Sequence, residues 1–282
     1  MEDLMKEAAD EILVKYEKYL RRNEMSENTI DSYLWTATFF LNSYEGNITR
    51  ATVLDYKEYL VKNYKKPATV NQRLQALNCF LRYLHKGAFC VKTIRIQRKN
   101  YLDNVVSNRD YKKFIRCLQE DGKTKWYMIV RTLVCTAARI SEAVNMQVED
   151  VIEGYVDIYS KGTVRRIYFP KVLQDELLQW LEGEHRTSGP LFLNKNGVRI
   201  SINGVETMLK KYAQQYGIDA KSVHPHAFRH RYAINFLEKH KSSNSWVDLA
   251  DILGHKSIDM TRIYTRHTAN EQRRLVDRTV TW

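Results

Sequence analysis

Six side chains from residue 139 onward could together break a phosphodiester bond. They are two arginines, two histidines, one lysine and one tyrosine: Arg139 in TAARISEAV, Lys161 in YVDIYSKGTVRRIYF, His226 and Arg229 in HPHAFRHRYA, and His255 and Tyr264 in LGHKSIDMTRIYTRH. A tyrosine hydroxyl, with an ordinary pKa of about 10, attacks poorly unless cations and an imidazole assist it. This set therefore favours a tyrosine nucleophile that works among cationic groups and without a metal ion.

Each residue type suits one task of that reaction. The planar guanidinium groups of Arg139 and Arg229 can each donate two hydrogen bonds to phosphate oxygens while staying charged. Lys161 could protonate the leaving oxygen, because the pKa of a lysine falls when it is desolvated near other cations. His226 and His255 are the imidazoles available to the tyrosine.

Spacing supports this grouping. His226 and Arg229 are three residues apart and share one helix face. Pro225 precedes them as a helix-start residue, and His255 follows the helix-stop signal Leu253–Gly254. Taken singly, each residue has an ordinary structural explanation, and Tyr264 is one of 18 tyrosines. The inference depends on the whole set.

The charge distribution indicates an anionic partner. The formal net charge is +12, and no Asp or Glu occurs between Tyr59 and Leu102. That stretch has ten basic residues: Lys62, Lys65, Lys66, Arg73, Arg82, Lys86, Lys92, Arg95, Arg98 and Lys99. A segment of one sign needs counter-charge from elsewhere, which nucleic-acid phosphates would supply. We predict that five cations contact phosphates: Lys65, Lys66, Arg73, Arg165 and Arg166.

Hydrophobic periodicity predicts a mainly α protein with a small β-sheet. Residues 1–88 have the pattern of a four-helix domain, with caps at Ser26 and Thr49 and a helix start at Pro67. Residues 89–105 are a predicted extended, basic linker, and residues 106–282 a second domain. In that domain 155–169 alternates on both sides of Lys161–Gly162, as a hairpin does.

Composition also excludes several classes of protein. No apolar run approaches the ~20 residues that span a bilayer, and the acidic, amphipathic start MEDLMKEAADEIL is unlike a signal peptide. The four cysteines lack the spacing of a zinc site and are expected to be reduced. We expect a cytoplasmic, nucleoid-associated protein with no metal and no cofactor.

The motifs together resemble the tyrosine recombinases, the phage-integrase and Xer-like family of site-specific DNA recombinases. The matching strings are ARISEAV, the hairpin lysine, HAFRH, LGHKSI and IYT, in the family's order over about residues 107–266. Residues 1–88 resemble the family's core-binding domain. The resemblance implies a catalytic domain fold and a reaction that needs neither metal nor ATP.

The resemblance also implies roles. Tyr264 would attack the scissile phosphate to give a 3′-phosphotyrosyl link, with Arg139, Arg229 and His255 stabilising the transition state. Lys161 would protonate the leaving 5′-oxygen, and His226 would assist proton transfer at the tyrosine. Glu142 would orient the site, whereas His230 would pack structurally.

Partners follow from the same resemblance. They are double-stranded DNA with a specific recombination site, further copies of the chain in a synaptic homotetramer, and, where the system uses them, accessory proteins. The tail, about residues 267–282, would dock on a neighbouring protomer or pack on its own. Two alternatives remain: a type IB topoisomerase-like enzyme that relaxes DNA, and a non-catalytic DNA-binding protein on the same scaffold.

Overall fold

The computed structural model describes residues 2–96, 105–160, 163–242, 244–255, 261, 264 and 277–279. The chain divides into two compact units, residues 1–98 and 99–282. Each unit is described by itself below. Lys161 and most of the tail lie outside the described residues.

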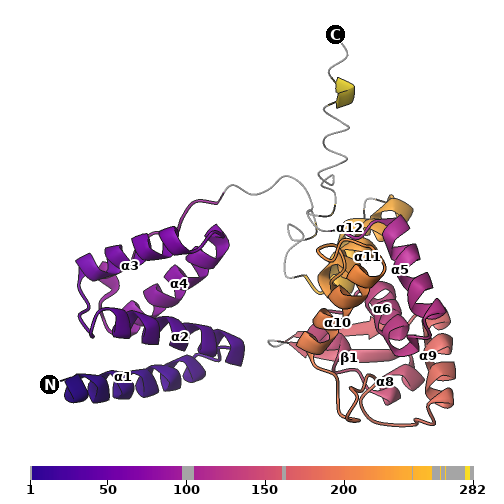
Figure 1. Ribbon diagram of the computed structural model, residues 1–282, viewed down its shortest axis with the longest axis horizontal. Helices are drawn as coiled ribbons and strands as arrows, with labels where there is room; N and C mark the ends of the chain where they lie inside the picture. Colours follow the sequence, from indigo (N-terminus) through magenta and orange to yellow (C-terminus); the bar gives the residue numbers. More distant parts are fainter. Residues whose placement is uncertain are drawn as a thin grey trace. The chain divides into compact units, whose positions relative to one another are not determined.

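The first unit consists of helices (Figure 1). They are α1 (Glu2–Arg22), α2 (Glu27–Ser43), α3 (Arg50–Asn63), α4 (Pro67–Tyr83) and the short 3-10 turn η1 (Gly87–Phe89). The Thr49 hydroxyl caps α3 by accepting from the Thr52 amide, and Pro67 occupies the first turn of α4. Ser26 is the N-cap residue of α2, although its side chain does not bond the helix backbone. The predicted helix starts are thus confirmed.

The core of the first unit forms along α4. Leu74, Leu77 and Leu81 recur at steps of three and four, and all three are fully buried. Beyond α4 the chain stays attached, because Asn78 bonds both backbone polar groups of Val91. Asn71 holds Ile94 in the same way. The described start of the predicted linker therefore packs on the first unit, and the domain boundaries themselves stay a prediction.

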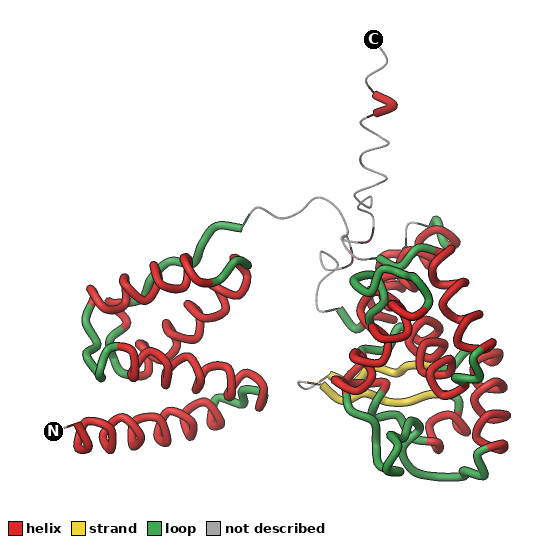
Figure 2. The backbone as a smooth tube through the Cα atoms, viewed as in Figure 1, coloured by secondary structure: helices red, strands yellow, loops and turns green. Residues whose placement is uncertain are grey.

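The second unit is mainly helical and carries one two-stranded sheet (Figure 2). Its elements are α5 (Asn108–Glu120), α6 (Thr124–Thr136), α7 (Ile140–Ala143), α8 (Val148–Glu153), β1 (Tyr155–Ser160), β2 (Thr163–Tyr168), α9 (Lys171–Gly183), α10 (Ile202–Gln215), α11 (Pro225–Lys239) and α12 (Ser245–Leu253). The fold class is therefore the one predicted, mainly α with a small β-sheet.

The predicted hairpin strands are present. β1 and β2 are antiparallel, and their pairing runs from Tyr155 with Tyr168 to Ser160 with Thr163. Alternation along β2 buries Ile167 at 3% exposure and leaves Tyr168 at 66%. Arg165 shares the inward face with Ile167.

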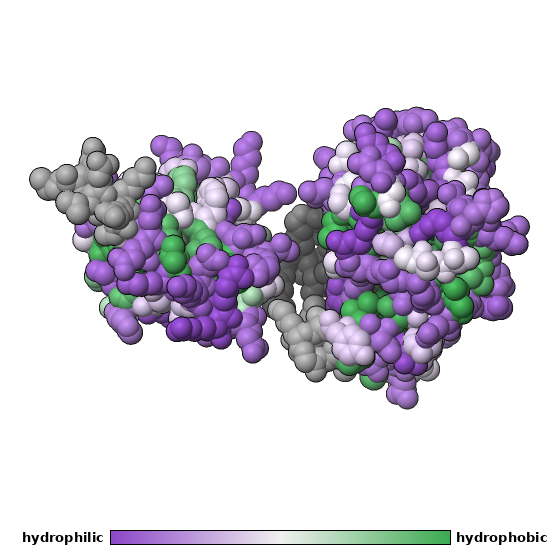
Figure 3. Space-filling view, turned by 90° about the horizontal axis from the view of Figure 1, so that it is seen from below, coloured by the Kyte–Doolittle hydropathy of each residue, from purple (hydrophilic) through white to green (hydrophobic). Residues whose placement is uncertain are grey.

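Two clusters of buried residues organise the second unit. The larger one includes Phe114, Leu133, Leu177 and Phe228. A smaller one joins Ala137, Ala233, Leu249, Leu253 and Tyr264. α11 packs against α6, and α12 packs against α11 and β2, so three helix ends and one strand converge where the predicted functional residues lie. In the face drawn in Figure 3, the surface is mostly hydrophilic, with apolar residues in separate patches.

Candidate active site

Arg139 stands at a sharp turn between two helices. α6 ends at Thr136 with the C-cap residue Ala137, whose φ of 53° is left-handed, and Arg139 is the N-cap residue of α7. Glu142 accepts from the Arg139 amide at 2.7 Å and from its guanidinium at 2.8 Å. Because one carboxylate holds both the backbone and the side chain, the arginine is fixed in direction, while 43% of its side chain remains exposed.

Arg229 comes from the first turns of α11. Pro225 begins that helix, and the His224 side chain caps it by accepting from the Ala227 amide. Arg229 is only 2% exposed and donates to the carbonyls of Ala137 and Leu253. It therefore connects the end of α6 to the end of α12.

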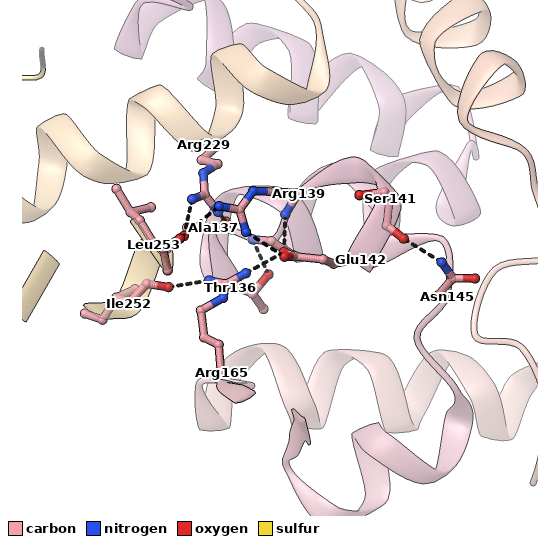
Figure 4. A network of polar contacts seen from close by, with 12 residues as sticks. Thr136, Ala137, Arg139, Ser141, Glu142, Asn145, Arg165, Arg229, Ile252 and Leu253 are labelled. Atoms are coloured by element: carbon pink, nitrogen blue, oxygen red, sulfur yellow. Dashed lines mark hydrogen bonds and ion pairs between the residues drawn. The ribbon is translucent and has the colours of Figure 1, made fainter. Parts of the chain in front are cut away.

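Three arginines meet at the C-terminus of α12 (Figure 4). Arg165 donates to the carbonyl of Ile252, Arg229 to that of Leu253, and Arg139 to that of Gly254. A helix C-terminus carries unpaired carbonyls and partial negative charge, so it attracts cations. Each guanidinium has five N–H groups, and the carbonyl bonds leave donors for another acceptor. The helix end thus gathers three positive charges in one place.

Glu142 balances part of this charge. It is 8% exposed and also accepts from Arg165. Burial alone would raise the pKa of its carboxyl, but the Arg139 amide and the charge of Arg165 outweigh burial and lower that pKa. Glu142 is consequently ionised at neutral pH and fastens two arginines to one point.

Tyr264 lies beside this cluster and against histidines. Its side chain is 6% exposed. The Tyr264 ring lies 6.1 Å from the His255 ring, stacked, and 5.2 Å from the His230 ring, edge to face. His230 in turn lies 4.1 Å from the exposed His226. A chain of imidazoles therefore leads from the tyrosine to the surface.

Burial and nearby charges keep His255, His230 and Tyr264 uncharged at neutral pH. Burial, followed by the charge of Arg229, lowers the pKa of His255 to about 4. Burial and the neighbouring His226 lower that of His230 to about 3. Burial raises the pKa of Tyr264, which Arg229 opposes by its charge and by hydrogen bonding. Arg229 itself stays charged, although burial and the other arginines lower its pKa to about 10.

The structure brings together most of the predicted site residues. Arg139, Arg229, His226, His255, Tyr264 and Glu142 share one region, whereas Lys161 lies outside the described residues. His230 packs with ring contacts against both Tyr264 and His226, and its structural role stays a prediction.

The predicted phosphate contacts separate into two kinds. Lys65 and Lys66 are exposed, and Arg166 is 43% exposed while it pairs with Asp157. Arg165 and Arg73 are engaged within the protein instead. Arg165 is 12% exposed and bonded to Glu142. Arg73 donates to Ser32 and Thr36 and stacks over Trp35 at 3.9 Å. Nothing in the structure tests the predicted phosphate contacts of these two arginines, and they stay predictions.

Sequence reasoning missed one polar partner in the site. The buried Thr261 hydroxyl lies 2.9 Å from Nδ1 of His255, and nothing in its local sequence marks it. Among the described residues, no group of three or more His, Cys, Asp or Glu side chains could hold a metal ion.

Comparison with known proteins places this geometry in a family. The model of the Phage integrase family matches residues 104–271, which is more than half of the chain. The chain belongs to the phage integrase family, the tyrosine-type site-specific DNA recombinases. It is 29% identical to "Tyrosine recombinase XerA" of Pyrococcus furiosus, over 95% of this chain and 93% of the relative.

Solved structures of phage integrase relatives share the fold. The Tn1549 transposon integrase in complex with transposon right end DNA superposes with a TM-score of 0.72 at 16% identity, covering 96% of this chain and 99% of that one. A lambda integrase tetramer bound to a Holliday junction gives 0.69 at 16% identity, covering 90% and 76%. Among the described residues of this chain, no helix is long and apolar enough to cross a membrane.

Proposed function

We propose that this recombinase cleaves DNA by attack of the Tyr264 hydroxyl on the scissile phosphate. The Tyr264 oxygen bonds to phosphorus, the bond from phosphorus to the 5′-oxygen breaks, and a 3′-phosphotyrosyl link and a free 5′-hydroxyl result. The reverse reaction with another 5′-hydroxyl rejoins the strand. The observation that carries the proposal is the position of Tyr264, buried next to Arg229 and in ring contact with two histidines.

Arg139 and Arg229 are suited to the charge of the transition state. Arg139 is held by Glu142 and the carbonyl of Gly254, and Arg229 by the carbonyls of Ala137 and Leu253, before any phosphate arrives, so they need no reorganisation during reaction. Preorganised donors of this kind contribute about 10²–10³-fold each in rate. His255 adds a third donor when Thr261 donates to its Nδ1, because the proton of a neutral ring then lies on Nε2.

Proton transfer must accompany attack. The raised pKa of Tyr264 keeps its hydroxyl protonated at neutral pH, so a base has to take that proton as the new bond forms. His226 fits this role, since partial burial and the charge of Arg229 lower its pKa while part of the residue stays open to solvent. At the other end of the reaction, Lys161 would supply the proton to the 5′-oxygen, the role that the family resemblance gives it.

The partners of the reaction are a specific DNA site and further copies of the chain. The lambda integrase structure, a tetramer on a Holliday junction, supports a synaptic homotetramer here. Lys65 and Lys66 on the first unit would contact phosphates. The tail, about residues 267–282, would dock on a neighbouring protomer. The structure describes only residues 277–279 of it. The protein would act in the cytoplasm, where its DNA lies.

Covalent capture tests the proposal. The purified protein is incubated with sheared genomic DNA of the organism that carries the gene, denatured, and the protein-linked fragments are sequenced. We expect wild-type adducts at one recurrent sequence and none with Tyr264→Phe. Tyr212→Phe, another buried tyrosine of the same unit, is the matched control and should give the wild-type result. No wild-type adduct would overturn the proposal.

A plasmid assay distinguishes the two alternatives. A recombinase should convert a plasmid with two copies of the captured sequence into deletion or inversion products, and leave a plasmid without them supercoiled. Relaxation of any plasmid at equal rates would indicate the topoisomerase. Site-specific binding without adducts would indicate the non-catalytic DNA-binding protein.

A further inference from the structure

Arg165 occupies an unusual position for a cation on a short hairpin. It follows the predicted hairpin turn, yet its side chain points inward and is 12% exposed. Its guanidinium bonds the Glu142 carboxylate and the carbonyl of Ile252. These partners lie 23 and 87 residues away in sequence, so a single side chain connects β2, α7 and α12.

Gly254 makes room for this side chain. A Cβ at position 254 would lie 2.5 Å from Cδ and 2.8 Å from Nε of Arg165. The same glycine has a φ of 59°, a conformation that closes α12 and that side chains disfavour. Helix closure and the close approach of Arg165 thus both require glycine here.

The three segments that Arg165 connects each lead to a functional residue. β2 begins two residues after Lys161, α12 ends two residues before His255, and Glu142 holds Arg139. Displacing Arg165 would release the carboxylate that orients Arg139 and the helix end that carries His255. Moving such groups by about 1 Å can reduce a rate about 10²-fold.

We propose that Arg165 is a positioning residue of the recombination reaction, which locks β2 to Glu142 and to the end of α12 so that the catalytic groups stay in register. It acts through Glu142 and Ile252 and does not contact DNA. This inference rests on the proposed function, because it assigns a step of the same reaction to a further residue.

The test separates binding from cleavage. Arg165→Ala, Arg165→Lys and Gly254→Ala are compared with wild type on a nicked duplex that carries the captured DNA sequence. For each, the Kd and the single-turnover rate of adduct formation at saturating DNA are measured. Arg131→Ala is the matched control, since Arg131 forms a similarly buried pair with Glu176 at 2.8 Å.

We expect Arg165→Ala to slow adduct formation about 10²-fold with little change in Kd. A lysine at position 165 can bond either Glu142 or the carbonyl of Ile252, but it lacks the forked guanidinium that bonds both. Arg165→Lys should therefore retain more of the rate than Arg165→Ala. Arg131→Ala should keep the wild-type rate. If Arg165→Ala fails to fold, Arg165→Lys and Gly254→Ala decide, because both should still slow cleavage with Kd retained.

A double-mutant comparison adds an independent readout. Gly254→Ala should slow cleavage strongly in wild type and much less in the Arg165→Ala background, where the clash is gone. Additive effects would overturn the inference, as would a wild-type rate for Arg165→Ala or a loss confined to Kd, which would mark a phosphate contact. Absence of a wild-type adduct would overturn the proposed function and the inference with it.

Discussion

The two units of this protein use their cations differently. In the first unit, the basic side chains are spread over separate sites. Arg50 donates to the carbonyls of Phe89 and Cys90, and Lys57 donates to that of Lys92. Lys65 and Lys66 are exposed. In the second unit, three arginines converge on one helix end. Dispersed cations suit a long polyanion, whereas converged ones suit a single phosphate.

The comparison teaches that charge alone does not identify a catalytic cation. Exposed lysines attract phosphates from a distance and are screened by salt. The arginines of the second unit are instead held by carbonyls and Glu142 in a partly dry site, where their charge acts more strongly. Variants of Arg229 and of the exposed lysines test this distinction.

The largest effect is expected at Arg229. Arg229→Lys keeps the charge but cannot reproduce the forked bonds to Ala137 and Leu253 together with a phosphate contact. Single-turnover adduct formation should fall about 10²–10³-fold. Arg186→Lys is the matched control, because Arg186 likewise donates to two carbonyls, those of Pro190 and Leu191. An equal loss of rate in both variants would contradict the account, because Arg229 would then behave like an arginine with a structural role alone.

A medium effect is expected from pH on stability. The unfolded chain binds protons at the ordinary histidine pKa of about 6.5, whereas folded His255 and His230 bind them only near pH 4 and 3. The unfolded state therefore binds more protons than the folded state between about pH 6.5 and these lower values, and stability is lost as pH falls from about 6.5 through 4 toward 3.

Thermal melts across this range measure the effect. One kcal/mol corresponds to roughly 2–4 °C in Tm for a domain of this size, so a decrease of several degrees is expected. His230→Phe should flatten the pH dependence, while the exposed His185, replaced by Phe, should leave it unchanged. A wild-type slope in His230→Phe would show that this histidine is not kept neutral by its surroundings.

The smallest effect is expected at the exposed lysines. Lys65→Ala and Lys66→Ala should each reduce the slope of log K against log salt by about one, without changing cleavage at saturating DNA. Lys18→Ala on the acid-containing α1 serves as control and should keep the slope. Unchanged slopes for both lysine variants would show that the acid-free segment of the first unit does not contact DNA phosphates.

Local signals made much of this fold predictable. Thr49, Pro67, Ser107 and Pro225 each start a helix through their own backbone or hydroxyl chemistry, which a short stretch of sequence contains. The hairpin also follows from alternation on either side of its turn. The family motifs then supplied the set of site residues.

The arginine cluster was not predictable by such local rules. Its bonds join residues 87 and 115 positions apart, and β2 carries apolar residues on both faces, so alternation alone does not say that Arg165 points inward. The stacking of Arg73 on Trp35 was not predictable for a related reason, because it depends on how α2 and α4 pack.

Mass-spectrometric mapping of the covalent adduct tests the central claim most directly. Wild-type protein trapped on the nicked duplex is digested with protease and nuclease, and the nucleotide-bearing peptide is sequenced. We predict a single modified residue, Tyr264, linked to a 3′-phosphate, with a free 5′-hydroxyl on the released strand. A nucleotide on any other residue, or a link to a 5′-phosphate, would contradict the account.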